Sequence, residues 1–169
     1  MEAKQAQFWE ELKSGKFLSM VKESSRGQSL GSSQEVFNIL KPLFAKEDDV
    51  EKMFFVFLDR KNKVLAIENL FSGSLTGSFV YPREIMKRIL SFKAAALVMA
   101  HNHPSGDPTP SREDLSITLY TFMVVHSIGV QLLDHVIIGD TYYSMAEEGN
   151  LKKIKQQVDD FYKGGPYEF

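Results

Sequence analysis

The stretch His101-Asn-His103-Pro-Ser-Gly-Asp-Pro-Thr-Pro110 holds two histidines and three prolines, and Ser111-Arg-Glu-Asp114 follows it directly. The residues before it, Ala94-Ala-Ala-Leu-Val-Met-Ala100, form an apolar run without charge, which predicts a buried β-strand. Successive side chains on a strand point to opposite faces, so we expect His101 and His103 to leave the strand on one face. Two imidazoles that project side by side can hold one metal ion.

A carboxylate is expected at the same place. Ser111-x-x-Asp114 opens an apolar, helical stretch, so Asp114 falls in the first turn of a helix. The prolines before it stiffen the connecting turn. Serine and an acid at this spacing are also typical of a helix N-cap, where they satisfy backbone N–H groups and stabilise the positive helix end. Capping and metal binding are compatible, so the pattern predicts that two nitrogens and one carboxylate meet at one point.

This ligand set favours hydrolytic chemistry. Two nitrogens and one oxygen leave one tetrahedral position of zinc open for water. Zinc lowers the pKa of such a water from about 15.7 to about 7. A closed structural zinc site usually takes four ligands, mostly cysteine, and the chain contains no cysteine. The sequence therefore favours an open site over a structural one.

The whole motif resembles that of a known family. His-x-His, seven residues, Ser, two residues and Asp is the JAMM signature of the JAB/MPN+ metalloproteases. The string HNHPSG…PSxxD, with Pro82-Arg-Glu84 upstream and Asp134-His-Val-Ile-Ile-Gly139 downstream, resembles the RadC-like branch of that family. The resemblance covers roughly Glu51 to Ser144. It implies an α/β fold with a mixed β-sheet flanked by helices, the JAB/MPN (cytidine-deaminase-like) sandwich.

The resemblance also implies a set of site residues. His101, His103 and Asp114 would be ligands of Zn2+, and Ser111 would help to hold the oxyanion of a tetrahedral intermediate. The chain would then be a zinc-dependent metallopeptidase or isopeptidase that acts on a peptide or isopeptide. The retained ligands favour this interpretation over a non-catalytic MPN-like binding module.

The family mechanism needs a glutamate upstream as general base, within hydrogen-bond reach of the attacking water. Glu51 is the first candidate, because in this family the glutamate precedes or opens the strand next to the metal strand. Glu68, in the middle of a predicted strand, and Glu84, in the first turn of a predicted helix, are its rivals.

Two neighbours of the motif receive weaker predictions. Asn102 should point to the face opposite the two histidines, where it anchors a loop rather than touches substrate. His135 could orient a metal ligand. A hydrogen-bonded core histidine is the interpretation we favour for it.

The chain divides into residues 1–31 as an N-terminal helical lead and linker, 32–163 as a catalytic domain of the JAB/MPN type, and 164–169 as a C-terminal tail. Segment 71–79 is a candidate substrate-side loop. Phe8, Trp9 and Phe17 could dock on the domain itself or on a second subunit, which would make a homo-oligomer. Strands are predicted at 52–58, 64–71, 95–101, 130–138 and 141–144, and helices at 82–91, 111–127 and 147–162, with another opening at the capping box Ser32-x-x-Glu35.

Composition limits the partners and the compartment. A chain of 169 residues with 43% hydrophobic residues can build a proper core. The absence of cysteine, of a signal peptide and of a long apolar run predicts a cytoplasmic protein without a membrane partner. A net charge of −2 with scattered basic residues gives little support for nucleic-acid binding.

A role as a RadC-type accessory protein of DNA repair remains the alternative. Longer RadC-like proteins carry a helix-hairpin-helix module, and residues 1–45 show no Gly-x-Gly hairpin.

Overall fold

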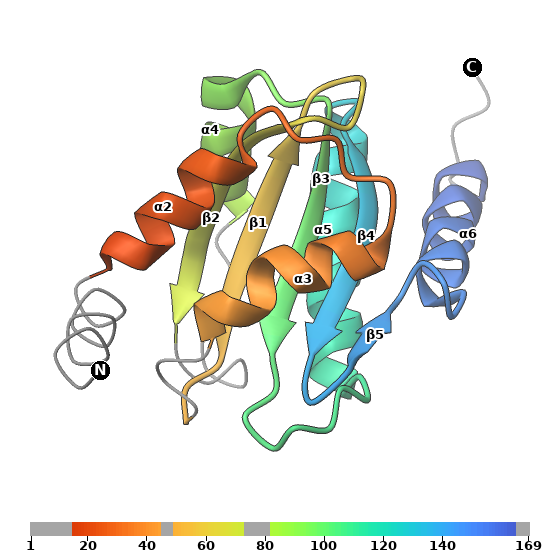
Figure 1. The fold of residues 1–169 in the computed structure, drawn as a ribbon. Coiled ribbons are helices and arrows are strands. Elements are labelled where there is room, and N and C mark those ends of the chain that lie inside the picture. Colours follow the sequence, from red (N-terminus) through yellow and green to blue (C-terminus); the bar gives the residue numbers. More distant parts are fainter. Residues whose placement is uncertain (1–14, 45–48, 73–81, 165–169) are drawn as a thin grey trace, which may run out of the picture.

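The computed structural model describes residues 15–44, 49–72 and 82–164. Its strands are β1 (Lys52–Leu58), β2 (Val64–Ser72), β3 (Ala96–Asn102), β4 (Gln131–Ile138) and β5 (Tyr142–Ser144). Its helices are α2 (Lys16–Ser25), α3 (Ser33–Phe44), α4 (Pro82–Phe92), α5 (Arg112–Ser127) and α6 (Asn150–Lys163). Figure 1 shows the strands side by side, with helices in front of them and behind.

The strands form one mixed sheet in the order β2-β1-β3-β4-β5. β3 and β4 run parallel and are connected through α5, whereas the other neighbouring pairs are antiparallel. The predicted α/β fold with a mixed sheet flanked by helices is therefore confirmed. All residues of β3 are buried, as expected for a strand covered on both faces.

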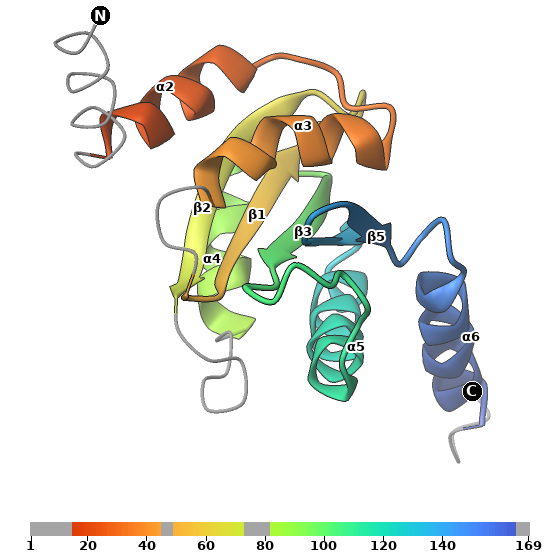
Figure 2. The same ribbon diagram turned by 60° about the horizontal axis from the view of Figure 1, so that its bottom comes forward.

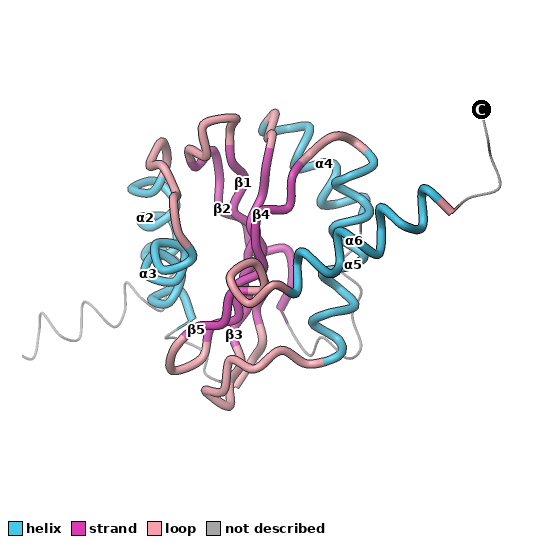
Figure 3. Tube along the Cα trace, turned by 90° about the vertical axis from the view of Figure 1, so that its right-hand side faces the viewer, coloured by secondary structure: helices cyan, strands magenta, loops and turns pink. Residues whose placement is uncertain are grey.

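Alternation along β1 builds a core on each face of the sheet. Phe55 and Phe57 pack with residues of α4, α5 and α6, whereas Phe54 and Val56 pack with residues of α3. Figure 3 shows the two layers of helices, with α2 and α3 on one side of the sheet and α4, α5 and α6 on the other. This layering decides which face of β3 the functional side chains enter.

The loop from β3 to α5 lies at one end of the sheet, where Figure 2 shows it leading into the first turn of α5. Within the described ranges, no helix is both long enough and apolar enough to cross a membrane. Phe8 and Trp9 lie outside the described residues, as does most of the candidate substrate-side loop, since residues 73–81 are not described.

Candidate metal centre

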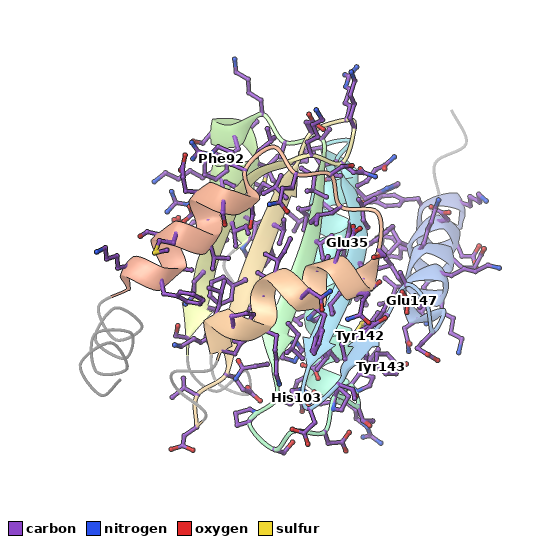
Figure 4. The ribbon with its side chains drawn as sticks, in the orientation of Figure 1. Glu35, Phe92, His103, Tyr142, Tyr143 and Glu147 are labelled. Atoms are coloured by element: carbon purple, nitrogen blue, oxygen red, sulfur yellow. The ribbon has the colours of Figure 1, made fainter. Side chains whose placement is uncertain are left out.

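Strand β3 delivers the two histidines to one end of the sheet. His101 is the penultimate residue of β3 and is fully buried. The His103 N–H donates to the Ile138 carbonyl (2.9 Å), so the backbone follows β4 for one residue beyond the strand. His101 and His103 thus lie on the same face, with ring centroids 4.8 Å apart, as the sequence predicts. Figure 4 shows His103 at this end of the sheet.

The loop after His103 is held against the end of β4. The carbonyl of Gly106 accepts a hydrogen bond from the Asp140 N–H (2.8 Å). A Cβ built on Gly139 would lie only 2.1 Å from the Gly106 carbonyl oxygen, so the close approach requires glycine there. Nδ1 of His103 lies 2.8 Å from the Asp107 carbonyl oxygen and donates its proton to it. Nε2 of His103 is then the nitrogen that faces His101 and Asp114.

Helix α5 brings the carboxylate. Ser111 caps the helix: its Oγ accepts from the Asp114 N–H (3.0 Å), and Asp114 Oδ2 accepts from the Ser111 N–H (2.7 Å). This reciprocal box fixes the Asp114 side chain in the first turn, where it is fully buried. The same two residues therefore cap the helix and aim a carboxylate at the histidines.

The three side chains converge on one point. Nε2 of His101 lies 3.0 Å from Nε2 of His103 and 3.0 Å from Asp114 Oδ1. Nε2 of His103 lies 3.2 Å from Asp114 Oδ2. Ligands of one tetrahedral zinc ion stand on the order of 3.3 Å apart, given metal–ligand distances of about 2.0–2.2 Å. The spacing of these donor atoms therefore suits a single small cation.

One oxygen of the cluster lacks a hydrogen-bond partner. Asp114 Oδ1 is buried and accepts no hydrogen bond, although Nε2 of His101 lies close by. Buried carboxylate oxygens are normally satisfied, so such an orphan requires an explanation. His101, His103 and Asp114 form a group that could hold a metal ion, and a cation would satisfy the orphaned oxygen. The residues present thus fit the expected metal.

The electrostatics of the cluster favour an ionised acid. Burial favours the neutral form of Asp114, but the neighbouring imidazoles of His101 and His103 outweigh it and hold the pKa of Asp114 well below its usual range. A hydrogen bond from protonated His103 to Asp114 raises the pKa of His103, against the opposing effect of desolvation. The cluster thus keeps a negative charge beside two imidazoles.

His135 is a hydrogen-bonded core histidine, as the favoured interpretation holds, and it also contacts a metal-ligand candidate. The ring is fully buried, and its Nε2 lies 2.8 Å from Nδ1 of His101. Its Nδ1 lies 2.6 Å from Oγ1 of Thr118, whose hydroxyl donates to the Asp114 carbonyl. Burial holds the pKa of His135 well below its ordinary value, so the ring stays neutral.

These contacts fix where the protons lie. The Thr118 hydroxyl donates its only proton to the Asp114 carbonyl. Its oxygen therefore accepts a hydrogen bond from Nδ1–H of His135. Nε2 of His135 then accepts from Nδ1–H of His101, and Nε2 of His101 carries the lone pair that faces the cluster. Thr118 lies one helical turn after Asp114 on α5, and this i, i+4 spacing is the signal for it in the sequence.

The candidate general bases lie in different places. Glu51 directly precedes β1, and Met53, two residues on, pairs with His101 across the sheet. The charge of Glu51 contributes to the raised pKa of His103, after the larger effect of Asp114.

Its two rivals lie on other elements. Glu68 lies on the edge strand β2, which β1 separates from β3, and its carboxylate is 3.7 Å from Nζ of Lys22. Glu84 lies in the first turn of α4.

The chain is similar to a known protein family and to several of its members. The model of the RadC-like JAB domain family matches residues 30–150. A UPF0758 protein of Halalkalibacterium halodurans is 51% identical over 102 residues, which are 60% of this chain and 44% of that protein. A UPF0758 protein of Methanosarcina mazei is 40% identical over 126 residues, 74% of this chain and 55% of that protein.

A third relative extends the similarity. A UPF0758 protein of Thiobacillus denitrificans is 41% identical over 133 residues, 78% of this chain and 59% of that protein. The chain thus spans about half the length of the curated relatives that it matches. The family match covers more than half of the chain and includes every residue of the cluster. The chain belongs to the RadC-like JAB domain family.

Proposed function

We propose that this chain is a zinc-dependent metallohydrolase that cleaves an amide bond in a peptide or isopeptide. The observation that carries the proposal is the buried cluster of His101, His103 and Asp114, with its orphaned carboxylate oxygen. Zinc held there by these three side chains would supply Lewis acidity, which polarises a carbonyl and lowers the pKa of water to about 7. The remaining steps fall to side chains of the chain itself.

Glu51 acts as the general base. Its carboxylate takes the proton of the attacking water and returns it to the leaving amine, which needs a carboxylate within hydrogen-bond reach of both. The proximity of its charge to His103 and its place before β1 support this role over Glu68, which lies beside Lys22 on the edge strand. Glu51 therefore supplies the proton transfers of the reaction.

Ser111 supplies an oxyanion donor. Its Oγ accepts the Asp114 N–H as a helix cap, which leaves the hydroxyl proton to be donated elsewhere. A donor aimed at the oxyanion that develops on the substrate carbonyl lowers the barrier for amide cleavage. The cap thereby holds this donor at the edge of the cluster.

The test is hydrolysis of a mixed library of fluorogenic peptides and isopeptide-linked dipeptides by the zinc-loaded chain. We expect turnover by the wild type and a rate at least about 100-fold lower for Glu51→Gln with an unchanged zinc content. Glu68→Gln is the matched control and should keep the wild-type rate. Equal rates for the wild type and Glu51→Gln would refute the proposed base. A zinc-loaded wild type without activity on any member would favour a binding module.

A further inference from the structure

Asn102, the last residue of β3, lies between the two metal-ligand candidates but faces the other way. The alternation along β3 puts its side chain on the sheet face that α3 covers, and only 6% of the residue is exposed. Its position on the strand predicts that it anchors a loop, and the structure identifies the segment that it holds. The side chain reaches across to the residues that precede β1.

Both ends of the Asn102 amide bind the backbone of that segment. Oδ1 accepts a hydrogen bond from the Lys52 N–H (2.7 Å), and Nδ2 donates to the Val50 carbonyl (3.1 Å). One side chain thus bridges the residues on both sides of Glu51. The backbone pairing between β1 and β3 ends with Met53 opposite His101, so the Asn102 amide makes its contacts just beyond the end of that pairing.

The Asn102 side-chain amide therefore extends the hydrogen bonding between β1 and β3 beyond the last backbone pair. Along β1, Met53 belongs to the core on the α5 side of the sheet, the side on which Asp114 lies. Continued alternation through Lys52 puts Glu51 on that same side. If residues 50–52 rotated about the strand axis, the Glu51 side chain would leave the face of the metal cluster.

We infer that Asn102 is a positioning residue, whose amide fixes the backbone on either side of Glu51 so that the Glu51 carboxylate stays beside the metal cluster. The inference rests on the proposed function, because it gives Glu51 the role of general base. A displacement of about 1 Å at a catalytic group can cost about 100-fold in rate, so a clamp of this kind matters to catalysis. A purely structural staple would instead affect stability alone.

The test uses Co(II) as a spectroscopic probe in the full chain. Asn102→Ala removes both hydrogen bonds, and Asn102→Leu removes them while keeping the volume. Ser33→Ala is the matched control, because it removes hydrogen bonds to Asp134 and Ser144 on the α3 side of the sheet. For each variant, and for Glu51→Gln, we would measure the Co(II) stoichiometry, the visible absorption spectrum of the bound ion and the hydrogen-exchange rate of the Lys52 amide.

We expect each protein to bind one Co(II) per chain. Glu51→Gln should shift the visible bands, Asn102→Ala and Asn102→Leu should reproduce that shift, and Glu51→Gln added to Asn102→Ala should add nothing. The Lys52 amide should exchange at least about tenfold faster in both Asn102 variants, because its N–H loses the hydrogen bond to Asn102 that protects it from exchange. Ser33→Ala should leave both the bands and the Lys52 exchange rate unchanged.

Three outcomes would overturn the inference, and they differ from one another. Faster exchange at Lys52 with a wild-type spectrum in the Asn102 variants would show that Asn102 stabilises the backbone but does not position Glu51. A wild-type spectrum for Glu51→Gln would show that Glu51 does not act on the bound ion. A folded wild type that binds no Co(II) would remove the metal centre, and with it the proposed function as well as the positioning role.

Discussion

Nδ1 of His101 lies 2.8 Å from Nε2 of His135, and both rings are fully buried. The pair connects His101 of β3 to α5, because His135 also contacts Thr118, one turn after Asp114. A ligand histidine usually donates its second ring N–H to an oriented acceptor, and a neutral imidazole is an uncommon choice for that acceptor. The tautomer of His101 consequently depends on Thr118, whose hydroxyl bonds the backbone carbonyl of Asp114 and not its carboxylate.

Thr118→Val should weaken metal binding. The substitution removes the acceptor of the His135 Nδ1–H, so the proton can move to Nε2 and oppose the Nδ1–H of His101. Loss of such an outer partner typically costs about 10- to 100-fold in metal affinity. Competition titration against a chromophoric chelator measures the change. Thr121→Val makes the same chemical change in the buried part of α5 and should keep the wild-type affinity. Equal affinities for both variants would contradict the relay.

Ser111 should separate into two roles when it is substituted. Ser111→Ala loses the cap and the hydroxyl, so we expect about 1 kcal/mol lower stability and roughly 100-fold slower hydrolysis. Ser111→Asn keeps a good capping side chain but has no hydroxyl, so it should lose the rate and keep the stability. Chemical denaturation and steady-state rates measure the two effects. A wild-type rate for Ser111→Asn would remove the oxyanion role.

Gly139→Ala should displace the loop that follows His103, although Gly139 itself lies outside that loop. The new Cβ would meet the Gly106 carbonyl oxygen at 2.1 Å and push away the loop that follows His103. We expect a destabilisation of about 1–3 kcal/mol and weaker metal binding. Gly31→Ala is the control, since its Cβ would approach nothing closer than Glu35 Oε2 at 3.8 Å. Unfolding midpoints and metal titrations that match the wild type would contradict the close approach.

Metal affinity should fall in acid. The hydrogen bond to Asp114 raises the pKa of His103, so below that raised pKa the ring holds a proton that the metal must displace. The apparent affinity should therefore drop about tenfold for each pH unit below the raised pKa, and should level off above it. Calorimetric titration in two buffers counts the released protons. His126→Gln, at the other end of α5, should show the same profile. A flat profile between about pH 5 and 8 would contradict the coupling.

Much of the sheet could be predicted because its buried strands are visible as short apolar runs in the sequence. The apolar run at 52–58 coincides with β1, and 95–101 lies within one residue of β3, because both strands are buried on both faces. The helix predicted at 147 begins only at Asn150. A turn precedes it in which Asp134 accepts a hydrogen bond from the Ala146 N–H (2.9 Å), a contact between distant residues that local patterns do not contain.

The candidate site divides in the same way. His101, His103 and Asp114 could be proposed from spacing, because strand alternation and helix capping are local rules. The contact of His135 with His101 depends on the parallel pairing of β3 and β4, which no local pattern specifies. The clamp of Asn102 on the residues around Glu51 likewise depends on the pairing of β1 with β3.

The most direct test of the metal centre is the zinc content of the chain, purified without chelator. We expect about one zinc per chain in the wild type and in His126→Ala, and little in His103→Ala or Asp114→Ala. Circular dichroism would verify that each variant is folded. A folded wild type that holds no zinc, even after reconstitution, would contradict the proposed zinc site and the hydrolase function that depends on it.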